Sequence, residues 1–271
     1  MSGPKVGPGP RSLRLSGIQT AALARRSLVA EWRQLFSVLP GLVFPLLLAA
    51  VYTRQFQRAL GLPGFPEVES FLDFILPASI LQAVSFGASS AGTELALDIE
   101  NGFLDRLLAS PVARVPVLVG RLAGAAIVAA GKTLVIVAVF MVFGAEIAGG
   151  PAAVLVLLAV SSLLVLVIGG ISQVLAIRTG SQEEAVAATF PLIFVTIFMS
   201  SAFFPTSLMS GWFRVVAQNN PITWIVDPLR RLVVVGWSWT DAAATLGIPA
   251  VCAVGTVGAA LAALQRKLSR P

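Results

Sequence analysis

The chain has 271 residues, of which 56% are hydrophobic and only 12% are charged, and its formal net charge is +6. A soluble domain carries about 25% charged residues, so this composition leaves too little polar surface for a soluble protein and predicts a polytopic membrane protein. The chain has no histidine and a single cysteine, Cys252. These counts exclude imidazole-based acid–base catalysis, a Ser-His-Asp triad, most zinc sites and an internal disulfide.

The N-terminal region combines a tail rich in Gly and Pro with a basic amphipathic segment. Residues 1–15 are predicted to be disordered, and we expect no cleaved signal peptide because the first apolar run starts near residue 35. Residues 16–36 place apolar side chains on one helical face and include Arg25, Arg26, Trp32 and Arg33. This pattern predicts an interfacial helix on the inner leaflet; an ordinary juxtamembrane helix without a mechanical role is the alternative.

Residues 35–264 contain six apolar stretches, and a helix of roughly 20 such residues crosses about 30 Å of hydrocarbon. The stretches are residues 35–53, 71–92, 116–144, 151–177, 185–204 and 242–264. Prolines such as Pro191 are tolerated in spans because neighbouring helices satisfy the freed carbonyl groups. Gly169-Gly170 in the fourth stretch allows a neighbouring helix to approach closely. The sequence therefore predicts an all-α membrane protein with six transmembrane helices.

The distribution of the 19 Lys and Arg residues predicts the orientation. Six spans put both termini on one side; if that side is the cytoplasm, 13 basic residues lie inside, five lie outside and Lys132 lies within a span. Because Lys and Arg collect on the cytoplasmic side, we expect cytoplasmic termini and a basic cytoplasmic tail at residues 265–271. This topology accounts for the positive net charge, so no nucleic-acid partner is expected.

The predicted outer segment, residues 205–240, is too long for a simple turn and holds four of the five Trp residues, Trp224 among them. Trp prefers the membrane–water interface. We therefore expect a re-entrant segment of two short half-embedded helices, broken at Asn219-Asn220-Pro221 and supported by protein or water. An aromatic belt on an ordinary extracellular loop is the alternative interpretation.

Two strings imitate nucleotide-binding motifs but lack the context that such motifs require. AIVAAGKT, residues 126–133, fits a permissive phosphate-loop pattern, yet it lies inside a predicted span whose backbone N–H groups are already used. LSGIQ, residues 15–19, resembles the signature peptide of ABC ATPases, but only 14 residues precede it. The chain itself is therefore expected to bind neither ATP nor another cofactor.

Lys132 is predicted to lie deep within a span, where a Lys costs about 2.5–3.5 kcal/mol to insert. We expect it to face a partner or a polar cavity, with Asp73 and Glu146 near the outer span ends as candidate partners. Snorkelling, or a hydrogen bond to neighbouring carbonyl groups, is the alternative to a pathway or interface role. The spans lack clustered acidic residues, which argues against an ion-coupled carrier and against an intramembrane enzyme.

A charged run separates the second and third stretches. Residues 93–114 read TELALDIENGFLDRLLASPVAR and hold four carboxylates and two arginines. The string ENGFLDRLL at residues 100–108, followed by Ser110-Pro111-Val112 and Gly120-Arg121, resembles the segment between spans two and three of ABC-2-type permeases, especially daunorubicin-resistance exporters. Asn220-Pro221 and residues 227–236 are similar to that family's segment before the last span.

The resemblance implies a transporter built from separate subunits. Two permease chains, identical or paralogous, would pair in the plasma membrane, and each would dock an ATPase subunit that binds ATP and Mg. The cytoplasmic loop at residues 93–115 would carry a coupling helix made of Glu100, Asn101, Gly102, Phe103, Leu104, Asp105, Arg106, Leu107 and Leu108. Its apolar residues would anchor it in a groove of the ATPase, and its charged residues would set its orientation.

The resemblance leaves the substrate open. We expect a lipophilic drug or a lipid, because the aromatic residues gather in the outer segment rather than along a channel for sugar. The alternatives are an exporter of a lipid-linked glycan in the same family, a stand-alone channel or secondary carrier, and a structural anchoring partner without transport activity.

Overall fold

A computed structural model describes residues 25, 35–104, 106 and 114–268, and every regular element in these residues is a helix. The elements are α2 (Leu35–Gln55), η1 (Gln57–Gly61), α3 (Phe71–Glu100), α5 (Arg114–Val142), α6 (Gly150–Thr179), α7 (Gln182–Phe198), η2 (Thr206–Leu208), α8 (Gly211–Gln218), α9 (Pro221–Val234) and α10 (Trp239–Leu268). The prediction of an all-α protein is confirmed for this part of the chain. The predicted tail at residues 1–15 lies outside it.

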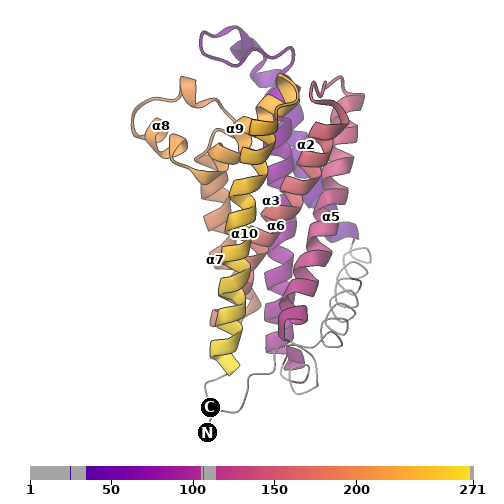
Figure 1. Cartoon of the computed structure of the whole chain (residues 1–271), viewed down its shortest axis with the longest axis vertical. Coiled ribbons are helices and arrows are strands. Elements are labelled where there is room, and N and C mark those ends of the chain that lie inside the picture. Colours follow the sequence, from indigo (N-terminus) through magenta and orange to yellow (C-terminus); the bar gives the residue numbers. More distant parts are fainter. Residues whose placement is uncertain (1–24, 26–34, 105, 107–113, 269–271) are drawn as a thin grey trace.

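The six long helices lie on the six predicted apolar stretches and run alternately up and down the bundle (Figure 1). Helix α6 is central, because α3, α5, α7 and α10 all pack against it. Among the described residues, three segments are long and apolar enough to cross a membrane: Leu118–Val142, Gly150–Thr179 and Trp239–Lys267. The apolar parts of α2 and α3 are shorter, and α7 has 17 residues. Six spans and cytoplasmic termini therefore stay predictions.

Polar caps fix the ends of two central helices. Ser70 Oγ accepts the N–H of Leu72 at 3.2 Å, and the Asp73 carboxylate accepts the N–H of Ser70 at 3.2 Å, so the start of α3 carries a capping box. Helix α6 ends at Gly180, which has φ +71° and donates its N–H to the carbonyl of Ala176 at 2.9 Å. A left-handed residue at this position favours glycine.

Two hydrophobic clusters fill the bundle. The larger one occupies most of its length and includes the buried side of α9. The smaller one lies at the end of the bundle where α3 and α10 finish (Figure 1) and is made of Leu95, Ala96, Leu104, Leu118, Ala176, Ile177, Ala185, Ala260 and Leu264. Five helices meet in this cluster, so the charged run begins at a packed end of the bundle.

Glycines let α6 contact two neighbours at backbone distance. A Cβ added to Gly92 of α3 would lie 1.9 Å from Oγ and 2.7 Å from the backbone carbon of Ser172 in α6. A Cβ added to Gly170 of α6 would lie 2.8 Å from Oγ1 of Thr256 in α10. The close approach expected at Gly169-Gly170 is thus confirmed at Gly170, and its partner helix is α10.

The outer segment folds as two short helices, α8 and α9, separated at Asn219 and Asn220 as the sequence predicts. Asn220 Oδ1 accepts the N–H of Ile222 at 2.8 Å and so caps α9. Its Nδ2 donates to the carbonyl groups of Thr196 and Met199, at 2.7 and 2.9 Å, near the end of α7. The Asn220 side chain therefore fixes the break between α8 and α9 against the end of α7. The depth of this segment in a membrane stays a prediction.

Arg230 fastens α9 to the rest of the bundle. Its guanidinium donates to the carbonyl groups of Phe74, Ser201 and Ala202 at 3.2, 2.8 and 3.0 Å. It also pairs with Asp227 at 3.2 Å and lies 3.8 Å from the ring centroid of Phe74. Burial lowers the pKa of Arg230 to about 10, so the side chain remains charged near neutral pH and its contacts persist.

The Gly92 contact yields a stability prediction. Gly92→Ala should lower the free energy of unfolding by about 1–3 kcal/mol, because the added methyl group forces α3 away from α6. Gly131→Ala is the matched control, since a Cβ at Gly131 in α5 meets nothing within 4 Å, and alanine favours helix by up to about 1 kcal/mol. Thermal unfolding of the detergent-purified proteins checks this; equal midpoints for the two variants would contradict the packing argument.

Candidate functional site

The charged run begins as helix rather than as loop. The sequence predicts a cytoplasmic loop at residues 93–115, whereas α3 continues to Glu100 and α5 already begins at Arg114. The physical reason is that residues 93–100 contain neither Gly nor Pro. The first such residue in the run is Gly102, which adopts φ +62°. The connection between the two helices is therefore shorter than expected, and it starts at a defined turn.

Backbone and side-chain contacts shape this turn. The N–H of Asn101 donates to the carbonyl of Leu97 at 3.0 Å, and the N–H of Gly102 donates to the carbonyl of Ile99 at 3.1 Å. The guanidinium of Arg106 reaches back to the carbonyl groups of Gly102 and Asn101, at 3.3 and 3.4 Å. The predicted coupling residues Asp105, Leu107 and Leu108 lie outside the described residues.

Leu104 has a different environment from the one expected. It was predicted to help anchor the loop in a partner, but its side chain is only 2% exposed and belongs to the smaller hydrophobic cluster. It packs there because the turn at Gly102 folds the chain back over the end of α3. Leu104 thus fixes the segment to its own bundle, while Phe103 beside it is half-buried.

Glu100 links the charged run to α7. Its Oε1 accepts the N–H of Gln182, the first residue of α7, at 2.7 Å. A carboxylate at a helix N-terminus satisfies an otherwise unpaired N–H group and interacts favourably with the helix dipole. Because Ser181, the N-cap residue, makes no side-chain cap of its own, Glu100 supplies the cap from another helix.

An ion pair joins the two helices on either side of the loop. Asp98 of α3 pairs with Arg121 of α5, and both residues are at most 9% exposed. The sequence drew attention to both, one in the charged run and the other in the Gly120-Arg121 match, but not to their pairing. The available sequence signal was that Asp98 and Arg121 have opposite charges and each lies within about two helical turns of the loop that joins α3 and α5, on opposite sides of it.

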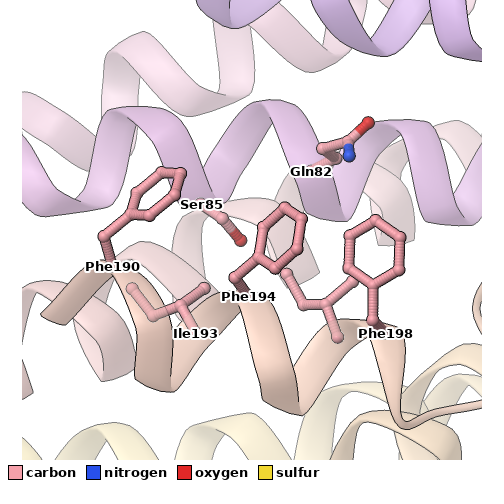
Figure 2. Close-up of a pocket in the computed structure, with 7 residues that line it drawn as sticks. Gln82, Ser85, Phe190, Ile193, Phe194 and Phe198 are labelled. Atoms are coloured by element: carbon pink, nitrogen blue, oxygen red, sulfur yellow. The ribbon is translucent and has the colours of Figure 1, made fainter.

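A groove between α3 and α7 was not predicted (Figure 2). Phe190, Phe194 and Phe198 follow one another on one face of α7, with ring centroids 5.9 and 4.3 Å apart. Gln82 and Ser85 of α3 line the opposite side. Phe190 and Phe194 are more than 40% exposed, so the groove presents a row of accessible aromatic rings. A four-residue spacing of Phe in α7 was the available sequence signal.

The open space in this groove is only about 20 Å³, enough for about one water molecule. Pockets that enclose drug-sized ligands have about 300–1,000 Å³. Gln82 is only 4% exposed, and its Oε1 is buried without a hydrogen-bond partner among the described residues, so this oxygen is not presented at the surface of the groove. The groove is therefore an aromatic surface rather than an enclosed site.

The aromatic row continues beyond the groove toward α2. Phe198 stacks on Phe203 with centroids 4.8 Å apart, and Phe203 meets Tyr52 edge-on at 5.8 Å. Tyr52 in turn meets Phe56 at 5.4 Å. These contacts connect α7 to the end of α2, so the exposed rings of the groove form one end of a continuous aromatic ladder.

The environment of Lys132 corrects its predicted pairing. Its Nζ lies 3.0 Å from the position of a Cβ at Gly87, so the side chain points to the middle of α3. Asp73 lies near the start of α3, about 20 Å from Gly87 along the helix axis, and accepts the N–H of Glu146 at 3.0 Å. Asp73 and the backbone of Glu146 therefore meet at the end of the bundle where α3 begins, and neither carboxylate pairs with Lys132.

The other predicted residues are accounted for as follows. Trp224 on α9 is 48% exposed and donates its Nε1–H to the carbonyl of Gln218 at 2.8 Å, so it connects α9 to the end of α8. Arg25 is helical and exposed. Arg26, Trp32 and Arg33 of the predicted interfacial helix lie outside the described residues.

No group of three or more metal-binding side chains occurs within the part of the chain that the structure describes.

Comparison with known families decides the class of this bundle. The family described as ABC-2 type transporter matches residues 18–234, from before α2 to the end of α9. The chain belongs to the ABC-2 type transporter family. The matched range includes the charged run, the groove and the pair of helices α8 and α9.

Individual relatives of this ABC-2 family member are transport permeases. The putative transport permease ycf38 of Cyanophora paradoxa is 25% identical over 213 residues, which are 78% of this chain and 72% of the relative. The daunorubicin resistance ABC transporter permease protein DrrB1 of Streptomyces coeruleorubidus is 27% identical over 198 residues, 70% of this chain and 66% of the relative. The ycf38 permease of Pyropia yezoensis is 25% identical over 234 residues, 85% and 79% of the two chains.

The buried ion pair yields a second stability prediction. Asp98→Leu alone should lower the free energy of unfolding by about 3–5 kcal/mol, because it leaves the Arg121 charge buried without its partner. The double variant Asp98→Leu/Arg121→Leu should be more stable than the single one, since no buried charge remains. Unfolding of the detergent-purified proteins by SDS measures both; a double variant less stable than the single would contradict this account.

Proposed function

We propose that the chain is the membrane subunit of an ATP-driven exporter that moves a lipophilic drug or lipid-like substrate. The observation that carries the proposal is the contact between Glu100 and the N–H of Gln182. It connects the segment that resembles a coupling helix to α7, the helix that carries the row of exposed Phe side chains. A displacement of the coupling segment would thereby move the helix that borders the groove.

A separate ATPase subunit supplies the energy in this proposal. AIVAAGKT, residues 126–133, lies within α5, where backbone N–H groups bond within the helix and are not free to hold phosphate. The ATPase would contact the exposed face of the turn that follows α3, where Glu100, Asn101 and Arg106 are exposed. ATP and Mg would bind to that partner, and the chain itself would act as a transport subunit without enzymatic activity.

A second permease chain would complete the substrate path. The groove holds about 20 Å³ of open space, so a single chain cannot enclose a lipophilic substrate there. Two rings of the groove itself, Phe190 and Phe194, are more than 40% exposed. An equivalent or paralogous chain facing this surface would close the groove into a cavity lined by aromatic rings from both chains.

The chemistry of the groove favours a lipophilic, aromatic substrate. Phe190 and Phe194 offer accessible ring faces without polar groups. A relative is named for daunorubicin resistance, and a fused aromatic compound of that kind would suit stacking on these rings. The Phe row of α7 removes the sequence-based reason against a glycan, namely that aromatic residues gather in the outer segment rather than along a channel. A lipid-linked glycan would still require more hydrogen-bonding groups than this surface offers.

The coupling role predicts a functional phenotype. The Glu100→Ala/Asp105→Ala variant should insert normally into the membrane, and its ATPase partner should still hydrolyse ATP. Export should fall by about tenfold or more, because tenfold corresponds to a loss of about 1.4 kcal/mol of coupling free energy. Export and hydrolysis are measured in vesicles that contain the permease and its ATPase. Glu67→Ala/Glu69→Ala, which removes two exposed carboxylates near the other end of the bundle, is the matched control.

A further variant separates the charge of Glu100 from its capping role. Glu100→Gln keeps an oxygen that accepts the Gln182 N–H, so it should retain more export than Glu100→Ala. Normal export by the Glu100→Ala/Asp105→Ala variant would refute the coupling role, whatever the behaviour of the control.

The groove predicts a change in substrate affinity. Phe194→Ala should weaken the apparent affinity for aromatic substrates by about 2- to 10-fold, since an aromatic contact contributes about 0.5–1.5 kcal/mol. Phe143→Ala is the control, because Phe143 is 72% exposed and lies just after α5, away from the groove. Transport of daunorubicin and of a non-aromatic lipid is compared; equal losses for both substrates would argue against stacking in the groove.

A further inference from the structure

An apolar cavity of about 170 Å³ lies among α3, α6, α7, α9 and α10. Helices α7 and α10 both pack against α6, yet they have almost no contact with each other within the described part of the chain. The cavity occupies the space that these two helices leave between them, and it is separate from the groove.

Buried side chains close one side of this cavity, and exposed side chains border its opening. Leu164 and Ile168 of α6 and Ile225 of α9 are at most 9% exposed and form its floor. Leu192 of α7 is 51% exposed, and Cys252 of α10 is exposed as well. The cavity therefore opens between α7 and α10, where Leu192 and Cys252 form its mouth.

The polar side chains of the described lining are either hydrogen-bonded or only weakly polar. Ser85 Oγ donates to the carbonyl of Leu81 at 2.7 Å, and Thr196 Oγ1 donates to the carbonyl of Leu192 at 2.7 Å. The thiol of Cys252 is a weak donor and a weak acceptor. A ligand in this cavity therefore gains apolar contacts and needs no polar group of its own.

Hydrocarbon suits this space better than water does. A buried water needs two to four polar partners, and an apolar cavity of about 150 Å³ in another protein stays dry and admits a benzene ring. The cavity thus has room for about six carbon atoms. Pockets that enclose drug-sized ligands have about 300–1,000 Å³, so this one fits the end of a chain rather than a whole lipid or drug.

The cavity lies at the depth of acyl chains if α6 and α10 cross a bilayer, as their length and composition allow. Each helix has 30 residues and is about 45 Å long, so each end extends about 7 Å past a hydrocarbon core of about 30 Å. The lining residues of the two helices fall within 164–171 and 248–252, at least about 12 Å from either helix end. The mouth therefore opens among acyl chains and not among headgroups.

The cavity and the groove share part of their walls. Ser85 of α3 and Ile193 and Ile197 of α7 line both of them, and Figure 2 shows Ser85 and Ile193 where they face the groove. A ligand in the cavity would contact the part of α7 that carries the exposed Phe side chains. Occupancy of the cavity would thus support α7 where it borders the groove.

We propose that this cavity binds the terminal segment of one acyl chain of a bilayer lipid, which enters between Leu192 and Cys252 and reaches the floor. The bound chain fills the space between α7 and α10 and holds α7 in place against α6. The proposal does not rest on the proposed function, because a bilayer lipid would occupy the cavity whether or not the chain transports anything.

Photocrosslinking of the full chain in phosphatidylcholine vesicles tests this proposal. The probe is a phosphatidylcholine that carries a diazirine at the end of one acyl chain, and peptide mass spectrometry locates the cross-links. Lipids that only surround the bundle cannot reach the floor, whose residues are at most 9% exposed. Cross-links at Leu164, Ile168 or Ile225 are expected, and their absence would overturn the proposal.

A variant that fills the cavity should lose these cross-links. Val167→Phe should lower the yield at the floor by about threefold or more, because it adds four carbon atoms to a space for about six. Val135→Phe is the matched control: it makes the same change at a 47% exposed residue of α5 that does not line the cavity. Equal yields in the two variants would contradict binding in the cavity.

Modification of Cys252 covers the case in which Val167→Phe fails to fold. Cys252 is the only cysteine of the chain, so N-phenylmaleimide adds bulk to the folded protein at a thiol of the mouth alone. The modified chain should show fewer cross-links at the floor, whereas Cys252→Ser treated in the same way should keep them. An unchanged yield after complete modification would overturn entry through this mouth.

Three further arms distinguish the source of the hydrocarbon. A diazirine near the glycerol end of the acyl chain should not label the floor, and equal labelling would overturn binding of the chain end. Labelling by a free fatty acid with a terminal diazirine, without labelling by phosphatidylcholine, would identify a fatty-acid site instead. Loss of the cross-links on addition of daunorubicin would assign the cavity to a transported substrate and overturn its assignment to a bilayer lipid.

Discussion

Close backbone contact between α6 and its neighbours sets the geometry of the bundle. Helices in a membrane gain little from hydrophobic burial against one another, so packing at small residues holds them together. Gly92 brings α3 onto α6, and Gly170 brings α6 onto α10. With α3 and α10 fixed on α6, the aromatic groove lies on the α3 side of α7.

Side chains complete the hydrogen bonding at the ends of helices, where the backbone cannot. The last carbonyl groups of a helix have no partner within it; at the end of α7 and just beyond, Asn220 and Arg230 bond to such groups. At the opposite end of the bundle, Glu100 accepts the N–H of Gln182 at the start of α7. Each end of α7 is thus held by a residue from another element, which makes α7 responsive to both.

The sequence predicted helices well and their lateral contacts poorly. Long apolar runs indicated the six long helices, and Asn219-Asn220-Pro221 indicated the break between α8 and α9, because hydrophobicity and proline act locally. The length of α3 was underestimated, since residues 93–100 are polar enough for loop yet contain no helix breaker. The burial of Leu104, the direction of Lys132 and the aromatic groove depend on which helices are neighbours, which one sequence does not specify.

The bond between Glu100 and Gln182 has a consequence for timing. A hydrogen bond to a charged group contributes about 1.5–3 kcal/mol, so the bond between Glu100 and Gln182 would be broken for roughly 1–7% of the time even in the resting protein. This hydrogen bond is therefore not a rigid connection, because it opens and closes much faster than a transport cycle. In the proposed exporter, a shift at the end of α3 would therefore change how often α7 is released, and the rate of transport would depend on how often this bond is open.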